Sequence, residues 1–403
     1  MFIARQPIFN QNLDVFGYEL LFRSDHQSKE FDGSSPTRAT ATVVSGLFES
    51  NIDQIVDDKC AFVNFDGDFI QSSTLELIEP HRLIIEVLEG VEVDDSLIAR
   101  LKELKNKGYK IALDDFVESY EEYPLVPLAD IIKFDIMATP LDKIGSTVQK
   151  ARLQKKILLA EKIETEEEFL QAKEMKFHLF QGYFFSKPRI IKKSDKRTIS
   201  NTHYTRLLSE LKKEEPSYQI LAEIIEQDVN LAYRLMRVAS IRSGDDLLYS
   251  IKRALTYMGL EEIERWINIL MLQAIDHSKP KELMRISLIR TKFAEAIANH
   301  GNLKHLRREA AMMGLFSTID AILDKNMSDA LKDISLPSSI KEVLIDQKGA
   351  LLPVHELLMA YEKGDWDATE TIANRMGIEA SILYYEYLST IEWARKTFEV
   401  IDM

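Results

Sequence analysis

The chain has 403 residues, of which 45% are hydrophobic and 29% are charged, and its formal net charge is −14. This composition is typical of a soluble globular protein with about two or three domains, and the acidic balance disfavours direct binding to nucleic acid. The single cysteine, Cys60, excludes an intramolecular disulfide and a cysteine-based zinc cluster. No apolar run approaches the roughly 18 residues that span a bilayer, so we expect a cytoplasmic protein that does not insert in a membrane.

The first half of the chain alternates short apolar runs with helical segments. Residues 2–9 and 15–23 are two strand candidates separated by turn-forming residues, so they should form a hairpin. A helix is predicted over 37–48, after Ser35 and Pro36. Further strands are predicted over 60–65, 83–88, 110–116, 131–136, 158–163 and 182–185, with helices over 95–107 and 166–175. Strands that alternate with helices indicate a parallel sheet.

Eight predicted strands are enough to close a barrel, and the hairpin makes the first strand antiparallel. The sequence therefore predicts a (β/α)8 TIM-like barrel in the first half of a multi-domain α/β and all-α protein. Polar residues interrupt or follow the apolar runs, namely Glu19, Asn64, Glu86, Glu89, Asp114, Asp115, Lys133, Glu161, Glu164 and Gln181. In a barrel the carboxyl ends of the strands meet at one mouth, so we expect many of these side chains to converge there.

Carboxylate and amide oxygens are the ligands that hard cations prefer, and two nearby carboxylates can bridge a pair of metal ions. Asp114 and Asp115 are the clearest candidates, because these two adjacent carboxylates end an apolar run. The alternative is that acidic residues only mark where strands stop. That alternative explains any one position better than it explains the whole set.

In this order the residues resemble the EAL domain, the family of metal-dependent cyclic di-GMP phosphodiesterases and their inactive, ligand-binding relatives. The resemblance runs from about residue 4 to residue 188, and the name motif stands here as Glu19-Leu20-Leu21. It implies one or two Mg²⁺ or Mn²⁺ ions held by Glu19, Asn64, Glu86, Asp114 and Asp115. It also implies catalytic roles for Lys133, Glu161 and Asp115, substrate binding by Gln6, Arg23, Glu164 and Gln181, and support of the loop after the aspartates by Glu89.

Two departures from the family pattern favour a barrel that binds without catalysis. In the family a loop rich in glycine and serine follows the paired aspartates, whereas here the chain continues Phe116-Val-Glu-Ser-Tyr-Glu-Glu. Glycine permits backbone conformations that other residues tolerate poorly, and the three glutamates are expected to repel an anionic substrate. The segment between Arg23 and Asn64 is also shorter than is usual for the family.

The second half shows helical periodicity almost throughout, with apolar residues at three- and four-residue spacings over 218–225, 231–239, 250–258 and 263–274. The stretch from Asp228 to about Asp320 resembles the HDOD domain, a relative of the HD phosphohydrolases. Where catalytic relatives carry a His-Asp metal pair this chain has Ser317-Thr318, and no His-Asp dipeptide occurs in the sequence. We expect His300, His305 and His355 at the surface or at helix ends, and the domain to bind no catalytic metal.

The predicted domains are an EAL-type barrel over 1–190, a linker over 191–205 and an HDOD-type helical domain over 206–403. This order resembles a class of bacterial two-domain signalling proteins. Two functions remain open at this point. The barrel either hydrolyses cyclic di-GMP to linear pGpG, or it is inactive and acts as a nucleotide receptor or protein-interaction scaffold. In both cases the helical domain is expected to bind other signalling proteins or a second copy of the chain, as in a homodimer.

Overall fold

The computed structural model describes residues 2–23, 52–117, 119–186, 202–226, 231, 234–235, 238–239, 250–273, 281–323, 325–332 and 336–402. The helix predicted over 37–48 lies outside these residues, as does most of the linker predicted over 191–205. In the part of the chain that is described, no helix is long and apolar enough to cross a membrane.

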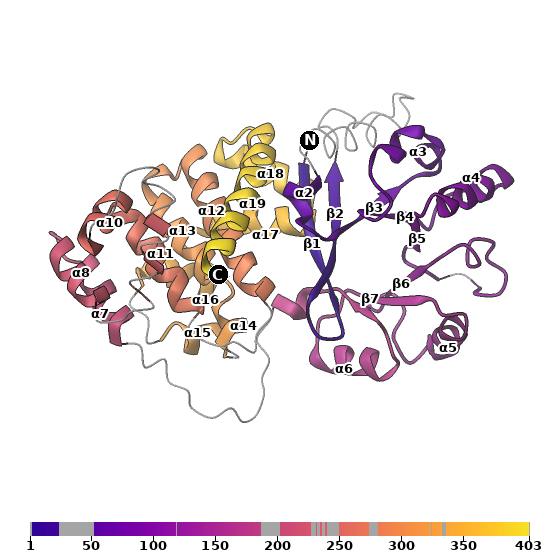
Figure 1. Ribbon diagram of the computed structural model, residues 1–403, viewed down its shortest axis with the longest axis horizontal. Coiled ribbons are helices and arrows are strands. Elements are labelled where there is room, and N and C mark those ends of the chain that lie inside the picture. Colours follow the sequence, from indigo (N-terminus) through magenta and orange to yellow (C-terminus); the bar gives the residue numbers. More distant parts are fainter. Residues whose placement is uncertain are drawn as a thin grey trace.

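Eight strands close into a barrel in chain order, on the right of Figure 1. They are β1 (Phe2–Asn10), β2 (Val15–Arg23), β3 (Cys60–Phe65), β4 (Leu83–Val87), β5 (Lys110–Leu113), β6 (Ile131–Asp135), β7 (Ile157–Glu161) and β8 (Leu179–Phe180). Strand β1 runs antiparallel to β2 and β8, and all the other neighbours are parallel. The predicted TIM-like barrel with an antiparallel first strand is confirmed.

The barrel strands are apolar because the fold buries both of their faces. All five residues of β4 are buried, for example, and inward side chains from seven strands fill the barrel interior. This apolar layer consists of Ile8, Phe62, Ile84, Ala112, Ile131, Leu159 and Leu179. A packed layer of this kind leaves no pore through the barrel, so a ligand must bind at one end of it.

The eighth strand lies earlier in the chain than the sequence predicts. The aromatic run at 182–185 suggests a strand, but these residues belong mainly to the short helix η2 (Tyr183–Ser186), and β8 ends at Phe180. Gly182 has a φ of +152°, and a Cβ there would lie 2.3 Å from the backbone N and O of Ile163. The chain leaves the sheet at this close crossing. Gln181 therefore follows the last strand instead of preceding it.

Helices and helical turns cover the outside of the barrel. They are α2 (Ile52–Val56), α3 (Gly67–Gln71), η1 (Ser73–Leu77), α4 (Asp95–Asn106), α5 (Gly145–Leu153) and α6 (Glu166–Glu174). The Asp94 side chain accepts a hydrogen bond from the Leu97 N–H and so caps α4. Thr165 and Glu168 form a capping box at the start of α6. These caps fix both helices at the residues where the sequence predicts them to begin.

The second half is helical, as predicted. Its elements are α7 (Thr202–Leu211), α8 (Tyr218–Glu226), α10 (Ile251–Met258), α11 (Leu260–Gln273), α12 (Lys281–His300), η3 (Lys304–Leu306), α13 (Arg307–Phe316), α14 (Ile319–Leu323), α15 (Met327–Ala330), α16 (Ser338–Asp346), α17 (Leu352–Lys363), α18 (Trp366–Met376) and α19 (Ala380–Asp402). Helix α7 begins inside the range predicted for the linker. The helix predicted over 231–239 is described only in part.

The two halves share a hydrophobic core along β1. This strand packs against α17 and α19, and one continuous apolar cluster contains residues from both halves. The Phe2 ring stacks on Trp366 with centroids 5.2 Å apart and meets the Tyr361 ring edge-on. Figure 1 shows the helical half lying beside the β1 and β2 side of the barrel. The packing brings residues from the end of the chain close to those at its beginning.

Candidate functional site

The positions of the polar residues at the barrel mouth follow from the two-residue period of a strand. Each lies two positions beyond a residue of the apolar layer, so it faces the same side of the sheet, toward the barrel axis. The pairs are Phe62 and Asn64, Ile84 and Glu86, Ala112 and Asp114, Ile131 and Lys133, Leu159 and Glu161, and Leu179 and Gln181. On the antiparallel β1 the order is reversed, and Gln6 lies two positions before Ile8, opposite Glu19 of β2. A polar layer therefore covers the apolar layer.

Lys133 lies at the centre of this polar layer and is completely buried. Its Nζ atom is 2.6 Å from Glu86 Oε1 and 2.6 Å from Asp114 Oδ1. The same atom is 2.9 Å from Glu161 Oε1 and 3.5 Å from Glu19 Oε1. One ammonium group therefore joins four carboxylates that come from four different strands or strand ends.

The charges in this cluster do not balance. Burial alone would lower the pKa of Lys133, but the carboxylates around it raise that pKa well above its ordinary value. Burial raises the pKa of Glu86 well above its usual range and that of Glu161 to about 8, although the Lys133 ammonium opposes both shifts. Buried carboxylates that outnumber their cation favour the binding of further positive charge.

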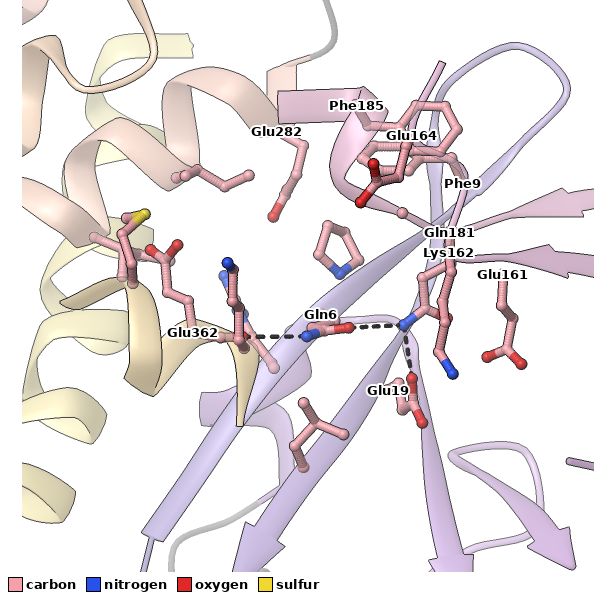
Figure 2. A pocket seen from close by; sticks show the side chains of 18 of the residues that line it. Gln6, Phe9, Glu19, Glu161, Lys162, Glu164, Gln181, Phe185, Glu282 and Glu362 are labelled. Carbon is pink, nitrogen blue, oxygen red and sulfur yellow. Dashed lines mark hydrogen bonds between the residues drawn. The ribbon is translucent and has the colours of Figure 1, made fainter. Parts of the chain in front are cut away.

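A row of hydrogen-bonded side chains links the cluster to β1 (Figure 2). Gln181 Nε2 donates to Glu19 Oε2 at 2.6 Å and to Gln6 Oε1 at 3.1 Å. Asn64 Nδ2 donates to Glu19 Oε1 at 3.3 Å. Gln6 Nε2 in turn donates to the backbone oxygen of Glu362, in the helical half, at 3.2 Å. The polar layer is therefore connected directly to the second half of the chain.

A cavity of about 540 Å³ opens above the polar layer, a volume typical of small-molecule sites. The barrel lines it with the carboxylates of Glu19, Asp114, Asp115, Glu161 and Glu164 and with Lys162. Helices α12 and α17 line it from the other side, with Ile289, Arg290 and Lys363 among their contributions. Local sequence patterns do not predict these helical residues, because their position depends on how the two halves pack.

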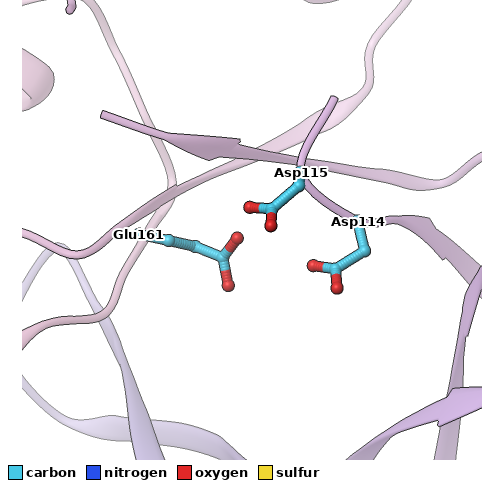
Figure 3. A group of neighbouring side chains, drawn as sticks. All are labelled: Asp114, Asp115 and Glu161. Carbon is cyan, nitrogen blue, oxygen red and sulfur yellow. The ribbon is translucent and has the colours of Figure 1, made fainter. Parts of the chain in front are cut away.

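Asp114, Asp115 and Glu161 form a group that fits a hard cation. One oxygen of each carboxylate lies within 4.8 Å of the others (Figure 3). Neighbouring strand residues normally point to opposite faces. Asp115 has a φ of +40°, so the extended run ends there and its carboxylate can lie on the same side as that of Asp114. In addition, Asn64 Oδ1 and Glu86 Oε2 are buried with no hydrogen-bond partner among the described residues. Oxygen donors of these types fit a divalent cation such as Mg²⁺ or Mn²⁺.

Two residues that the sequence singles out lie outside the cluster. Arg23, at the end of β2, forms an ion pair with Asp367 of α18, with Nη1 and Oδ1 2.6 Å apart. Glu89 is exposed in the turn after β4 and does not line the cavity. The roles of both residues remain predictions.

The loop after the paired aspartates packs against the barrel exterior. The Tyr120 hydroxyl donates to Gln154 Oε1 at 3.1 Å, and Glu121 forms an ion pair with Lys150 of α5. None of the described residues of 117–123 lines the cavity, and Glu118 lies outside the described residues. The expected repulsion of substrate therefore finds no support at Glu121, which is already paired with a lysine.

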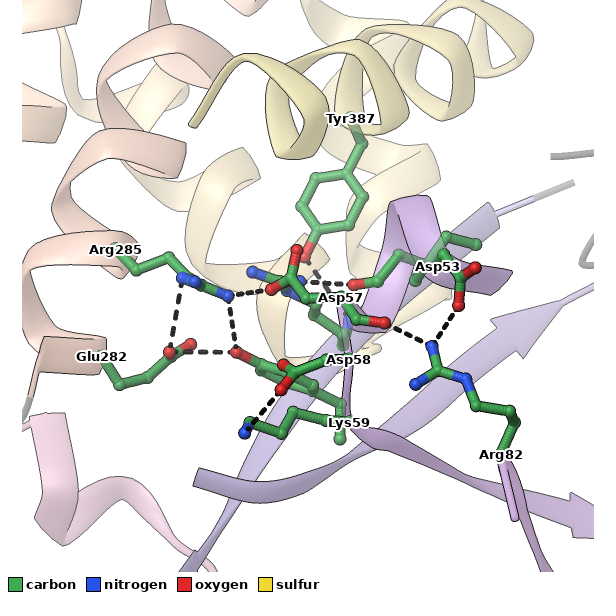
Figure 4. A network of polar contacts seen from close by, with 11 residues as sticks. Asp53, Asp57, Asp58, Lys59, Arg82, Glu282, Arg285 and Tyr387 are labelled. Carbon is green, nitrogen blue, oxygen red and sulfur yellow. Dashed lines mark hydrogen bonds and ion pairs between the residues drawn. The ribbon is translucent and has the colours of Figure 1, made fainter. Parts of the chain in front are cut away.

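A buried polar network joins the two halves beside the cavity (Figure 4). The Tyr18 hydroxyl donates to Glu282 Oε2 at 3.0 Å and accepts from Arg285 Nη1 at 3.2 Å. Arg285 also pairs with Asp57, at the end of α2. Burial raises the pKa of Glu282 above its usual range, although Arg5 and Arg285 oppose the shift. The network fixes the start of α12 against the barrel.

In the helical half, Ser317 and Thr318 stand where catalytic relatives of the HDOD domain are expected to carry a His-Asp metal pair, so hydroxyl groups occupy this position. The hydroxyls of Ser287 and Thr318 contact each other, and Arg290 Nη1 donates to Ser317 Oγ at 3.1 Å. His355 lies in the first turn of α17, at a helix end, and is half-buried because α17 packs between α12 and β1. Burial lowers its pKa to about 4.

Comparisons with known proteins agree with this architecture. Sequence models match the EAL domain over residues 1–188 and the HDOD domain over residues 199–341. The chain is 33% identical over 412 residues to the uncharacterized protein YuxH of Bacillus subtilis, a match that covers 99% of both chains. It is 32% identical over 402 residues to the cyclic di-GMP phosphodiesterase CdgJ of Vibrio cholerae, covering 98% of this chain and 92% of that protein.

A solved structure with an EAL domain is also similar. It is the Bacillus subtilis YkuI protein, in complex with c-di-GMP and calcium, with a TM-score of 0.40 and 22% identity over 64% of this chain and 73% of that chain. The two domain matches follow one another in order, and the similarity to YuxH and CdgJ extends across both of them. The chain therefore belongs to the bacterial two-domain EAL–HDOD signalling proteins.

Proposed function

We propose that the barrel hydrolyses cyclic di-GMP to linear pGpG with Mg²⁺ or Mn²⁺, and that the HDOD domain carries no catalytic site. The main support for this proposal is the set of carboxylates around Lys133. These carboxylates lie below a cavity of about 540 Å³. The similarity to CdgJ, a protein named as a cyclic di-GMP phosphodiesterase, gives independent support because it extends over almost the whole chain.

Each residue of the polar layer has a proposed role. Metal binding is assigned to Glu19, Asn64, Glu86, Asp114 and Asp115, and one or two ions held there supply activation of water and stabilisation of phosphoryl charge. Lys133 Nζ and Glu161 Oε1, 2.9 Å apart, position the attacking water, with Asp115 beside them. Water adds to one phosphorus atom, the bond from that phosphorus to a ribose oxygen breaks, and the released oxygen takes up a proton. The ring thereby opens to the linear dinucleotide.

The remaining residues are proposed to bind the dinucleotide. Gln6 and Gln181 present amide groups to the cavity, and Glu164 offers a carboxylate to base N–H groups. Arg23 has the planar, forked guanidinium that suits a phosphate group. Glu89 is proposed to support the loop that follows the paired aspartates. The HDOD domain is proposed to bind partner proteins or a second copy of the chain.

The alternative is a barrel that binds cyclic di-GMP without cleaving it. Two observations favour it. The loop after Asp115 lacks the glycines and serines of the family pattern, and the helical half contacts both Arg23 and Gln6 through residues that follow the HDOD match. In this alternative the barrel is a receptor, and its occupancy controls the HDOD surface.

A single set of assays separates these proposals. The full-length protein is incubated with cyclic di-GMP and either Mg²⁺ or Mn²⁺, and the products are separated by chromatography. We expect linear pGpG from the wild type and from Asp142→Asn, an exposed carboxylate variant of the barrel, but not from Asp114→Asn. Binding by the wild type without turnover would support the receptor alternative, and the absence of both binding and turnover would contradict both functions.

A further inference from the structure

The turn between α17 and α18 lies directly on the candidate dinucleotide site. The Glu362 backbone oxygen accepts a hydrogen bond from Gln6, and the Gln6 side chain is bonded through Gln181 to Glu19 (Figure 2). Lys363, the next residue, lines the cavity. The end of α17 is therefore part of the cavity wall and is connected to the carboxylate cluster by three hydrogen bonds in sequence.

The turn between α17 and α18 passes close to strand β2 at Gly364. Gly364 has a φ of +70°, and a Cβ at this position would lie 2.8 Å from the Leu21 side chain. Leu21 lies two residues after Glu19 and lines the same cavity. Glycine suits this position, because a side chain would be strained at this φ and would press on Leu21. The turn is held in place from behind by Arg290, a buried residue whose Nη2 is 2.6 Å from Glu362 Oε2.

The start of α18, just after this turn, supplies a carboxylate to Arg23. Glu19, Leu21 and Arg23 alternate along β2 and therefore share one face of the strand. Glu19 and Leu21 line the cavity, and Arg23 is the next residue on that face, although it does not itself line the cavity. Its Nη1 lies 2.6 Å from Asp367 Oδ1. A phosphate group and a carboxylate bind the same N–H donors of a guanidinium. Asp367 therefore occupies a donor that a phosphate of the ligand would use.

We infer that the helical half, through the end of α17 and the start of α18, completes the cyclic dinucleotide site of the barrel, and that Asp367 lowers the affinity by competing with a ligand phosphate for Arg23. This inference rests on the proposed function, in which Arg23 binds the dinucleotide. The Asp367 side chain is 82% exposed, so its replacement does not disturb the core. An exposed ion pair of this type is weak, and its removal is expected to change an affinity by about threefold to fivefold.

Binding of cyclic di-GMP to the full chain in the presence of Ca²⁺, measured by titration calorimetry, tests the inference. We expect Asp367→Asn to lower the Kd by about threefold to fivefold. The matched control is Asp346→Asn, an exposed aspartate of the same helical half that pairs with Lys348, and its Kd should equal that of the wild type. The gain from Asp367→Asn should disappear in an Arg23→Met background, because the competition requires the guanidinium.

The outcomes separate this inference from the function on which it rests. If the wild type binds no cyclic di-GMP, both the receptor and the enzyme functions fail, and the inference fails with them. If the wild type binds but Asp367→Asn leaves the Kd unchanged or raises it, the inference alone is overturned. It is also overturned if the gain persists in the Arg23→Met background, since Asp367 would then act without Arg23.

Discussion

Lys133 supplies the buried positive charge inside the carboxylate cluster of the barrel mouth. Four carboxylates lie within 3.5 Å of its ammonium group, and removal of one member of such a buried cluster typically costs about 3–5 kcal/mol. We expect Lys133→Met to lower the free energy of unfolding of the metal-free protein by about 3 kcal/mol. Added Mn²⁺ should restore part of this loss, because it replaces the missing positive charge. Urea unfolding with EDTA and with Mn²⁺ measures both effects.

The control for this substitution is Lys150→Met, which removes a lysine whose partner, Glu121, is exposed. Exposed pairs contribute at most about 1 kcal/mol, so this variant should unfold close to the wild type in both buffers. Equal unfolding free energies for Lys133→Met and the wild type would show that the carboxylates take up protons in place of the lost ammonium. The assignment of Lys133 as the stabilising cation would then be wrong.

At the scale of the elements, the sequence predicts the barrel from β1 to β7 because each strand is an apolar run bounded by turn-forming residues. The same runs identify Glu86 and Asp114, because a polar residue at the end of a buried strand has few structural explanations. The same pattern does not distinguish Glu89 from the residues of the cluster, because Glu89 has the same side chain as Glu86 but lies in an exposed turn. The pattern gives the wrong position for β8. This strand has only two residues, and the aromatic run that follows it has the composition of a strand but forms η2.

The end of β8 depends on Gly182. An alanine there would place its Cβ 2.3 Å from the Ile163 backbone and would require a φ of +152°, so the crossing of the two segments must open. We expect Gly182→Ala to reduce the free energy of unfolding by about 2 kcal/mol and to displace the neighbouring Gln181 from Glu19. Urea unfolding measures the first effect. The matched control is Gly145→Ala at the start of α5, where no heavy atom outside the adjacent residues and the local helix backbone lies within 4 Å of the added Cβ. A loss of stability there as large as at Gly182 would contradict the explanation.

At the scale of the whole molecule, the sequence predicts the two domains but not their interface. Tyr18 and Glu282 are 264 positions apart, and each is compatible with a surface position when read in its own segment. The sequence also does not predict the wall that α12 and α17 add to the cavity, because this wall forms only when the two halves pack together. Sequence patterns report local periodicity, and the contact of two separately periodic segments leaves no local signal.

The Tyr18 hydroxyl binds the start of α12 to the barrel, together with the ion pair between Arg285 and Asp57. In Tyr18→Phe, Glu282 and Arg285 each lose a buried hydrogen-bond partner, and such a loss costs about 1–3 kcal/mol. The loss should appear first as local opening of α12, because the network fixes that end of the helix to the barrel. We expect faster hydrogen exchange of backbone amides in the first turns of α12, measured by mass spectrometry on the full chain.

The control is Tyr109→Phe, which removes the same atom from a tyrosine whose hydroxyl donates to the Ile78 backbone oxygen at 2.6 Å, within the barrel. Its effect on overall stability should be similar, but exchange in α12 should remain that of the wild type. If both variants accelerate exchange in α12 equally, the effect comes from general loss of stability and not from the interface. A selective effect of Tyr18→Phe would show that the wall containing Arg290 is held in place by the barrel itself, because Arg290 lies on the same helix as Glu282 and Arg285.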